Sequence, residues 1–546
     1  MLGTSFPLHN KRLIFPFLLM IALLLVACGG GASEEAPSEQ AGESPAESTE
    51  IDVPASEEEA AEDELTPTEG GTLRVAMQPI VNTDPIAISS DSEVLVANHV
   101  YDYLVDIDAQ SNIIPRLATE WGASDGGLTY TFKLADNVTW HDGDAFSAND
   151  VVWTFDRLRT TEGTPTADLF ANVESVVATG DLEVTFKLSE PNSFFLYDLS
   201  DNHALILKEG TEDAATVFNG TGPFKVDRYS PEDRIELVAN EDYFIDGQPS
   251  LDRVEIIFFS DDAASIDALL SGQIDLVMRM PTALFVSLQE ESGIETVSIP
   301  TNGFDLVRLR SDREPGSDTR VMQALKLATD REAIFNVVQQ GFGAIGNDTP
   351  IGPLYEAYFD PSITPLSRDI DAARALLAEA GYDEDNPLIL TLHTPDTGGR
   401  PDLAAVLKEQ WSEAGVEIEI SVEPESVYYG DDGWLEVDLG ITGWGSRPYP
   451  QFYLDTMLIS GAKWNESHFA DEEFDQLVSI AGTTVDDSQR VKSYREIQQL
   501  LSDRGPILIP YFFAQLGAIS NQFENFEMKA FAGRTDFRDI VYVGSQ

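Results

Sequence analysis

The segment from Gly443 to Pro450 combines residue types that suit contact with a small molecule. It reads Gly-Trp-Gly-Ser-Arg-Pro-Tyr-Pro. Glycine and proline fix the path of a loop, while aromatic rings offer flat apolar faces and a guanidinium offers charge-assisted hydrogen bonds, a combination typical of a ligand clamp. A turn that carries an aromatic plug would use the same residue types, so both interpretations stay open. The candidate contact residues are Trp444, Gly445, Ser446, Arg447 and Tyr449.

No catalytic or metal-binding motif stands out elsewhere in the sequence. The chain has no Gly-x-Ser-x-Gly elbow, no Gly-x4-Gly-Lys-Ser/Thr loop and no His-Glu-x-x-His pair. Its six histidines are scattered singly, without the spacing of zinc ligands. We therefore expect a binding protein that is not an enzyme and that uses no cofactor and no metal.

Two other classes of protein stay open at this point. A surface hydrolase would need a poised pair of carboxylates roughly 5–10 Å apart. The sequence has 95 acidic residues and isolates no such pair. A sensor or adhesin could use the same scaffold without transport.

The net charge limits the range of partners. With 33 basic and 95 acidic residues, the chain carries a formal charge of −62. Such a surface repels phosphate backbones, so we expect no nucleic-acid partner. This many acidic residues is typical of a surface that keeps a protein solvated, as in salt-adapted proteins. The alternative interpretation is that the negative charge attracts cationic ligands.

The first 28 residues read as an export and anchoring signal. His9, Lys11 and Arg12 form a basic start, and Leu13 to Val26 is an apolar stretch too short for a membrane span. The stretch ends at Leu-Val-Ala-Cys, which resembles a bacterial lipobox, so residues 1–27 are expected to be removed and Cys28 to be lipidated. A plain secretory signal with an incidental cysteine is the alternative. We expect an extracytoplasmic protein anchored to the membrane by lipid.

Residues 28–69 predict a linker between that anchor and a folded body. From Ser33 to Glu69 the sequence has 14 acidic and no basic residues. Low hydrophobicity with this charge is typical of disorder. A flexible chain of this length reaches roughly 35 Å, which would let the body move near the membrane.

The body after residue 70 predicts mixed α and β structure in more than one lobe, because a single core stops growing at roughly 250–300 residues. Its first half predicts mainly strands, and its second half alternates strands with helices, as in βαβ units. Ligands on such sheets bind beyond the carboxyl ends of the strands, where the Gly443–Pro450 loop begins. The expected strands are 72–76, 128–134, 182–188, 254–259, 388–392, 416–422 and 437–442, and the expected helices are 262–270, one from Ser317 or Asp318 to Gly341, 371–380 and 403–413.

A succession of short motifs resembles a known family. The motifs are Pro-Arg-Leu-Ala-Thr-Glu-Trp from Pro115, Ser-Asp-Gly-Gly-Leu-Thr-Tyr-Thr-Phe from Ser124, Trp-His-Asp-Gly-Asp-Ala-Phe from Trp140, Asn-Asp-Val-Val-Trp-Thr-Phe from Asn149, Gly-Pro-Phe-Lys-Val from Gly222, Leu-Ser-Gly-Gln-Ile-Asp from Leu270, and Arg-Val-Met-Gln-Ala-Leu from Arg320 leading to Asp-Arg-Glu at Asp330. Each motif is weak alone, but their order along the chain is specific. Together they are similar to the peptide/nickel family, family 5, of ABC-importer solute-binding proteins, the dipeptide- and oligopeptide-binding type.

The resemblance implies an α/β fold of the two-lobed periplasmic-binding-protein type (type II, cluster C). Two crossovers, near Gly303 and near Pro510, would join the lobes, and the first lobe would carry an extra subdomain. The implied division is 70–303 for lobe I, with the subdomain at about 113–204, then 304–510 for lobe II and 511–546 for a return to lobe I. The resemblance also implies a monomer that captures a peptide or related solute between the lobes. The closed form would deliver it to a membrane permease driven by ATPase subunits.

The loop departs from the pattern of the family at one position. Peptide-binding members have an Asp three residues after the Trp, and it pairs with the α-ammonium of the peptide; here Trp444 is followed at that distance by Arg447. Two like charges about 4 Å apart cost about 4 kcal/mol at an effective dielectric near 20, so an ammonium fits poorly there. We expect an anionic or neutral group of the solute at Arg447, unless a protein carboxylate occupies it. Arg400 is a second candidate anion contact, and Asn82, Asp84 and Tyr101 are the candidates on lobe I.

Overall fold

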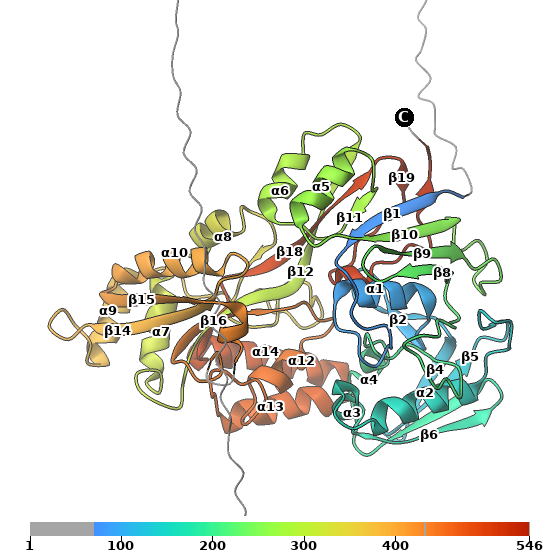
Figure 1. The fold of residues 1–546 in the computed structure, drawn as a ribbon. Coiled ribbons are helices and arrows are strands. Elements are labelled where there is room, and N and C mark those ends of the chain that lie inside the picture. Colours follow the sequence, from blue (N-terminus) through green and yellow to red (C-terminus); the bar gives the residue numbers. More distant parts are fainter. Residues whose placement is uncertain (1–69, 431–432, 545–546) are drawn as a thin grey trace, which may run out of the picture. The chain divides into compact units, whose positions relative to one another are not determined.

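The computed structural model describes residues 70–430 and 433–544. Their main feature is a 12-stranded mixed sheet, whose path runs β15-β14-β16-β12-β18-β11-β1-β10-β9-β8, with β13 and β17 off this path (Figure 1). Helices pack against the sheet, so the predicted α/β class is confirmed. The signal, Cys28 and the linker lie outside the described residues.

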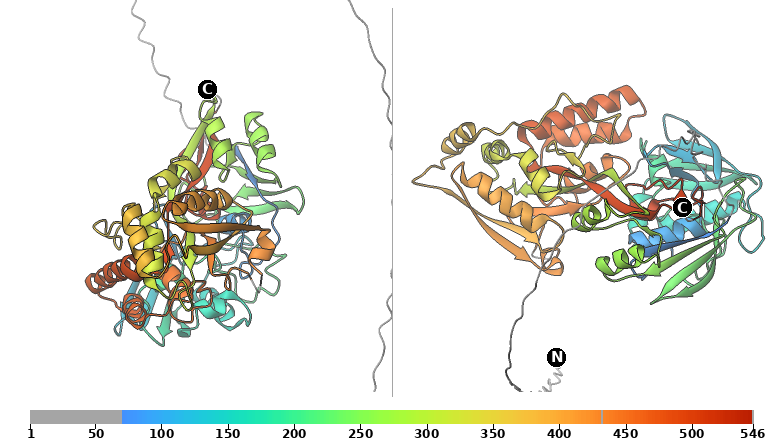
Figure 2. Two further views of the ribbon diagram at one scale, coloured as in Figure 1. Left: turned by 90° about the vertical axis from the view of Figure 1, so that its left-hand side faces the viewer. Right: turned by 90° about the horizontal axis from the view of Figure 1, so that it is seen from above.

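Two long strands carry the sheet from one half of the body to the other. β12 (Ile294–Leu309) first pairs with β18 (Tyr511–Ser520), is irregular between Pro300 and Phe304, and then pairs with β16 (Leu439–Trp444). Figure 2 shows this connection from above, as the green and red strands that join the two halves. These strands are the two crossovers of the expected fold.

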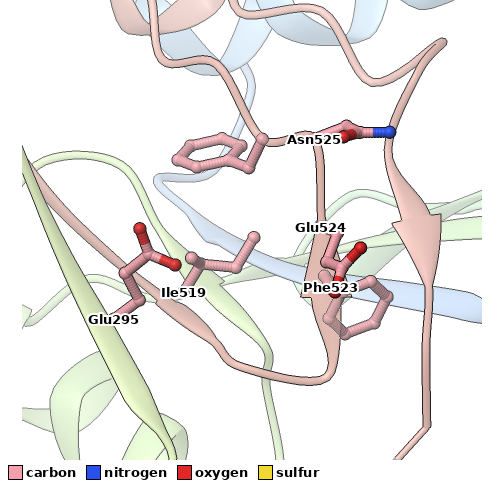
Figure 3. Close-up of a pocket in the computed structure, with 6 residues that line it drawn as sticks. Glu295, Ile519, Phe523, Glu524 and Asn525 are labelled. Carbon is pink, nitrogen blue, oxygen red and sulfur yellow. The ribbon is translucent and has the colours of Figure 1, made fainter. Parts of the chain in front are cut away.

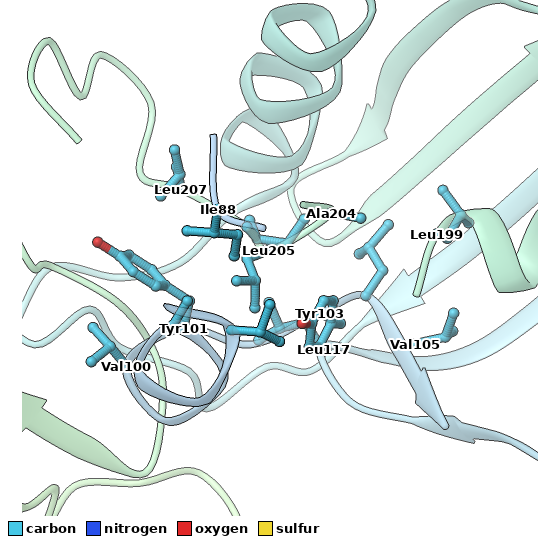
Figure 4. Packing of buried hydrophobic residues seen from close by; sticks show 14 of the residues in the cluster. Ile88, Val100, Tyr101, Tyr103, Val105, Leu117, Leu199, Ala204, Leu205 and Leu207 are labelled. Atoms are coloured by element: carbon cyan, nitrogen blue, oxygen red, sulfur yellow. The ribbon is translucent and has the colours of Figure 1, made fainter. Parts of the chain in front are cut away.

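Lobe I, as we use the term, is built on β11, β1, β10, β9 and β8. A separate antiparallel sheet, β4-β5-β7-β6, forms the additional part of this lobe, and the neighbouring α2 covers it. Most of its buried side chains form one hydrophobic cluster, part of which is shown in Figure 4, and a smaller second cluster includes Ile266, Leu269 and Phe285. The elements are β1 (Thr72–Met77), α1 (Asp91–Val100), β2 (Val105–Ile107), β3 (Ile113–Pro115), β4 (Ala118–Ser124), β5 (Thr129–Leu134), α2 (Ala148–Thr160), α3 (Pro165–Leu169), β6 (Val173–Gly180), β7 (Glu183–Leu188), α4 (Phe195–Asp198), β8 (Phe224–Ser230), β9 (Arg234–Ala239), β10 (Arg253–Phe258), α5 (Asp262–Leu270), β11 (Leu276–Val277) and α6 (Thr282–Leu288).

Lobe II is built on β15, β14 and β16. β14 and β15 are parallel and are joined by α10, which confirms the predicted βαβ unit, and β16 lies parallel to β14 on its other side. Most strands end within one or two residues of the prediction, but β16 runs to Trp444 and so includes the first two residues expected in the loop. The elements are α7 (Thr319–Ala328), α8 (Arg331–Val338), β13 (Ala344–Ile345), α9 (Ile370–Glu379), β14 (Leu388–Pro395), α10 (Arg400–Ser412), β15 (Val416–Glu423), α11 (Glu425–Tyr428), α12 (Gln451–Met457), α13 (Glu472–Thr483), α14 (Asp487–Arg504) and β17 (Ile507–Leu508).

The helix predicted from Ser317 or Asp318 to Gly341 is wrong in one respect, because the structure has two helices there. α7 ends at Ala328, Thr329 is extended, and Asp330 begins α8 by accepting a hydrogen bond from the backbone N–H of Ala333. An aspartate at this position stabilises a new helix start by about 1 kcal/mol. The apolar period continues through both helices, so periodicity alone could not reveal the break.

Some of the acidic residues cap the N-terminal ends of helices. Side chains of aspartates accept hydrogen bonds from the first turns of several helices, which satisfies backbone N–H groups that have no partner within the helix. A carboxylate there also interacts favourably with the positive end of the helix dipole. These capping residues are Asp261, Asp318, Asp330, Asp369, Asp471 and Asp486.

After β18 the chain returns to lobe I. The return includes β19 (Phe523–Glu524) and β20 (Val541–Tyr542), which pair with each other. Between them, Arg534 and Arg538 are buried and form ion pairs with Asp106 and Asp102 of lobe I. Buried charges need such partners, so the pairs fix the position of the returning segment.

His99, at the end of α1, is held in one neutral tautomer beneath this segment. Its Nε2 accepts a hydrogen bond from the backbone N–H of Phe537 at 3.1 Å, so Nδ1 carries the proton and donates to Leu95 O at 2.7 Å. The ring stacks on Phe537 and is fully buried. Burial, together with the positive charges of Arg538 and Lys529, lowers the pKa of His99 to about 4.

We expect a pH dependence of stability from His99. Its folded pKa lies below the value of about 6.5 in an unfolded chain, so the unfolded state binds more protons between these two values. The contribution is complete above pH 6.5 and is lost as the pH falls to 4, by about 3 kcal/mol. Urea unfolding of wild type and His99→Gln should show a steeper fall for wild type in this window. Parallel curves would contradict the assignment.

None of the helices in the described part of the chain is both long enough and apolar enough to cross a membrane.

Candidate functional site

Trp444 lies at the carboxyl end of β16, in the middle of a buried polar cluster of lobe II. Its indole Nε1–H donates to Glu466 Oε1 at 3.2 Å, and the Thr442 hydroxyl donates to Glu466 Oε2 at 2.7 Å. Arg308 on β12 donates to the same Oε2 at 3.1 Å and is fully buried with Glu466. Glu466 therefore fixes the strand that leads into the loop. Burial raises the pKa of Glu466, although the positive charge of Arg308 opposes this shift.

Hydrogen bonds hold Ser446 and Arg447 of the loop to Asn302 and Tyr355. Ser446 Oγ accepts from the backbone N–H of Asn302 at 3.1 Å, and Arg447 O accepts from the Tyr355 hydroxyl at 2.7 Å. A side chain at Gly303 would come within 3.1 Å of Ser446 N and Trp444 O. The close approach favours glycine here, because a larger side chain would push the loop by a few tenths of an ångström.

Among the described residues, Arg447 has no carboxylate at ion-pair distance. Its Nη1 donates to Ser446 O at 3.0 Å, and the guanidinium lies 4.5 Å from the ring centre of Phe452. Burial of Asp201 and His203 in lobe I is outweighed by their hydrogen bond to each other, which lowers the pKa of Asp201 and raises the pKa of His203. The positive charge of Arg447 adds a smaller effect that lowers both pKa values, so it acts across the junction between the lobes. These contacts hold the side chain in place and leave its charge available for an anion.

Tyr449 contacts lobe I directly. Its hydroxyl donates to Asp198 Oδ1 at 2.7 Å, and its ring stacks on Phe194 at 4.9 Å between centres. Burial raises the pKa of Asp198 to about 7, although the hydrogen bonds from Tyr449 and Asn192 oppose this shift. The loop that begins at Trp444 therefore contacts the opposite lobe through Tyr449.

Arg400 lies at the first turn of α10, beside β16. Its Nε donates to Asp305 Oδ1 at 2.7 Å, and Asp305 Oδ2 accepts from the Tyr511 hydroxyl at 2.6 Å. A side chain at Gly443 would clash with the Arg400 guanidinium, so the arginine passes directly over the residue before Trp444. Arg400 is close to the loop, but much of its charge is matched by Asp305.

The three candidates from lobe I each have another partner within that lobe. Asp84 pairs with Arg157, and the backbone N–H of Asn82 donates to Glu93 at 2.7 Å. Tyr101 is buried among apolar side chains, as Figure 4 shows, and its hydroxyl donates to the backbone oxygen of Val217. The structure thus gives these residues structural partners within lobe I and shows no contact of theirs with the Trp444–Tyr449 loop.

A pocket near the start of β12 is separate from this loop. It is lined by Glu295, Ile519 and the segment Phe523–Phe526 (Figure 3). Glu295 precedes Phe304, the partner of Trp444 in the sheet, by nine residues of the same strand. On the paired strand β18 the same span runs from Ile519 to Phe512, seven residues, so at about 3.3 Å per residue the pocket lies roughly 23 Å from the loop and does not belong to the same site.

Several residues of the site were not predicted. The segment Asn192–Asp198 follows Pro191 and contains two adjacent phenylalanines, a pattern that a strand or helix with one buried face would not need. That pair of aromatics was the available signal. The residues missed are Phe194, Asp198, Asn302, Tyr355, Phe452 and Glu466.

Chemically, the arrangement offers groups that can bind a small molecule. Within the described residues, no three His, Cys, Asp or Glu side chains are placed to hold a metal ion. The loop instead supplies an indole, a guanidinium and backbone groups at the junction of two lobes joined by two strands. The structure is thus a two-lobed α/β fold with a candidate binding loop at the junction of the lobes.

Comparison with known proteins gives the family. Residues 112–465 match the model of the middle region of the bacterial extracellular solute-binding proteins, family 5, and the chain belongs to this family. The dipeptide-binding protein of Escherichia coli K12 is 27% identical over 75% of this chain and 83% of its own. The oligopeptide-binding protein AppA of Bacillus subtilis 168 is 26% identical over 91% of this chain and 92% of its own.

A solved structure of a relative has a similar fold. The Bacillus subtilis oligopeptide-binding protein AppA in complex with a nonapeptide matches with a TM-score of 0.70 and 26% identity, over 87% of this chain and all of that one. The predicted family and two-lobed fold are therefore confirmed.

Proposed function

We propose that this protein is the extracytoplasmic solute-binding subunit of an ABC importer, and that its solute is a peptide or related small molecule with an anionic group. The protein captures the solute between its lobes and delivers it, chemically unchanged, to permease subunits that are driven by ATPases. It acts as a monomer and is tethered through a lipid on Cys28. The division into lobes at 303/304 and 510/511 belongs to the same proposal.

The observation that carries the choice of solute is the charge at Arg447. This guanidinium lies in the loop at the lobe junction and has no carboxylate partner among the described residues. A ligand carboxylate could form two parallel hydrogen bonds with it, which is the preferred geometry of an arginine–carboxylate pair. The relatives named for dipeptides and oligopeptides support the peptide class.

Tryptophan fluorescence tests the proposal, because Trp444 lies in the loop. Titrations would use the dipeptides Glu-Glu, Ala-Ala and Lys-Lys and N-acetylated Ala-Glu, each with wild type and Arg447→Ala. We expect the acidic and N-blocked peptides to bind best. Since hydrogen bonds to charged groups contribute about 1.5–3 kcal/mol, Arg447→Ala should weaken their binding roughly 10- to 100-fold.

Arg495→Ala is the matched control, because this arginine is largely exposed and pairs with Asp360 outside the loop. It should leave the affinities unchanged. Tight binding of Ala-Ala that Arg447→Ala does not weaken would overturn the role of Arg447. If no peptide binds at all, the peptide class is wrong.

A further inference from the structure

Asn302 lies where the first crossover strand leaves its regular pairing. β12 pairs with β18 up to Pro300 and again at Phe304, and from Phe304 onward it also pairs with β16, its other neighbour in the sheet (Figure 1). Such an irregularity in a strand can redirect a side chain, and irregularities of this kind are common next to binding sites. Asn302 is 3% exposed and lies beside the candidate ligand loop.

Three groups of Asn302 form hydrogen bonds, and two of these bonds go directly to the loop. The backbone N–H donates to Ser446 Oγ at 3.1 Å, and the side-chain Nδ2 donates to Arg447 O at 3.4 Å. The backbone oxygen accepts from the Tyr453 hydroxyl at 3.0 Å, and the same hydroxyl is shared with Gly445 O at 2.7 Å. The Asn302 side chain is therefore held against the residue that carries the candidate anion contact.

The fourth group, Asn302 Oδ1, is buried and has no hydrogen-bond partner among the described residues. Exchange of the amide oxygen and nitrogen would not supply one. Arg447 O also accepts from the Tyr355 hydroxyl at 2.7 Å, so an exchanged amide would place its oxygen against an oxygen that can only accept. Nδ2 must therefore face Arg447 O, and Oδ1 remains an acceptor without a donor.

The donors around Asn302 are already engaged. The backbone N–H of Gly303 donates to Thr301 Oγ1 at 3.1 Å, and the Thr301 hydroxyl donates in turn to a backbone oxygen of β18 at 2.9 Å. The hydroxyls of Tyr355 and Tyr453 donate to backbone oxygens of the loop. A buried acceptor without a donor is costly, and nearly all such groups in proteins are satisfied. A donor on the solute would satisfy this one.

We propose that Asn302 is a specificity-determining residue, whose Oδ1 accepts a hydrogen bond from an N–H of the solute next to the anionic group that Arg447 binds. An acylated amino acid, or the C-terminal residue of a peptide, carries an amide N–H one carbon away from its carboxylate. The favoured solutes are therefore of this class, and simple carboxylic acids and hydroxy acids are disfavoured. The proposal rests on the function proposed above, because it assumes an anionic solute at Arg447.

Replacement of one solute N–H by oxygen tests the proposal. N-acetyl-Ala-Glu would be compared with its ester analogue, in which 2-hydroxyglutarate replaces the glutamate residue. The two compounds have the same charge and nearly the same shape, but the ester has no N–H beside the carboxylate. Their affinities for the full-length protein would be measured by isothermal titration calorimetry. Since the ester leaves Oδ1 unpaired in the complex, wild type should bind the amide roughly 10-fold more tightly.

Asn302→Leu keeps nearly the shape of the side chain and removes the acceptor. This variant should bind the amide and the ester with nearly equal affinity, so the ratio of the two affinities should fall roughly 10-fold. Asn302→Ala provides the same comparison if the leucine variant folds poorly. A residue with a purely structural role would weaken the binding of both compounds and leave the ratio unchanged.

Asn347→Leu is the matched control. Asn347 is also buried, and its Oδ1 likewise has no partner among the described residues, but its Nδ2 donates to Ile351 O at 3.0 Å and not to the loop. The control should keep the affinity ratio of wild type. Arg447→Ala should weaken the binding of both compounds by the same factor, because both carry the carboxylates.

The proposal is overturned if wild type binds the amide and the ester equally, as it would if Oδ1 met only water. It is also overturned if neither Asn302 variant lowers the ratio, or if Asn347→Leu lowers it as much. In each of these cases, weaker binding of both compounds by Arg447→Ala would leave the anion contact standing. If neither compound binds wild type, the proposed solute class is wrong and the role of Asn302 is wrong with it.

Discussion

Arg538→Met is expected to lower the free energy of unfolding by about 3–5 kcal/mol, because it leaves a buried carboxylate without its charge partner. Arg538 is 1% exposed and donates to Asp102 Oδ1 at 2.9 Å, to the Tyr243 hydroxyl at 3.0 Å and to Asp536. Asp102 is fully buried, and after the substitution only Tyr243 and Thr221 would still donate to it. The loss comes mainly from the unpaired carboxylate, because methionine fills much of the space of the arginine stem.

Urea unfolding at pH 7 provides the measurement, with Arg495→Met as the control. Arg495 is also paired with an aspartate, but the pair is exposed and its atoms are 3.5 Å apart. Exposed pairs contribute about 0–1 kcal/mol, so the same substitution there should have little effect. Equal effects of the two substitutions would show that Arg538 does not fix the returning C-terminal segment.

Arg308→Met is the second substitution with a large expected effect, again about 3–5 kcal/mol of unfolding free energy. Arg308 and Glu466 are both buried, and Arg308 also donates to Val437 O at 2.9 Å and to Trp434 O. Removal of the arginine leaves the buried Glu466 carboxylate without its charge partner and with only the neutral donors Thr442 and Trp444 among the described residues, which raises its pKa further. Because Glu466 also accepts from Trp444, the emission of this tryptophan should change as well.

The double variant Arg308→Met/Glu466→Met separates the cost of an unpaired charge from the cost of lost packing. Replacement of a whole buried ion pair by apolar side chains is often neutral, so much of the stability should return in the double variant. If the double variant is as unstable as the sum of the two single variants, the charge pair is not the cause. If Arg308→Met changes the free energy of unfolding by less than 1 kcal/mol, the pair does not hold the loop.

The sequence predicted local structure where a short pattern of residue types decides whether a segment is a strand or a helix. The alternating strands around 128–134 and 182–188, and the βαβ unit from Leu388 to Glu423, lie where their patterns placed them. The break at Thr329 was missed because the apolar period continues across it. The loop was located by its composition, since few other segments combine Gly, Pro, Trp, Tyr and Arg so closely.

The partners of the loop could not be predicted in the same way. Tyr449 and Asp198 are 251 residues apart in sequence, and Arg538 and Asp102 are 436 apart. With 95 acidic residues in the chain, sequence alone cannot tell which carboxylate meets which arginine. The expected lobe I contacts Asn82, Asp84 and Tyr101 came from resemblance, and their partners in lobe I became visible only with the fold.

Native mass spectrometry of the full-length protein, mixed with a defined pool of di- to pentapeptides, tests the central claim most directly. If two lobes close on a dissolved solute and later release it intact, the complex should contain one protein chain and one pool member of unaltered mass. Peptides with acidic or blocked ends should be enriched. The absence of any complex, or the appearance of cleaved peptides in the pool, would contradict it.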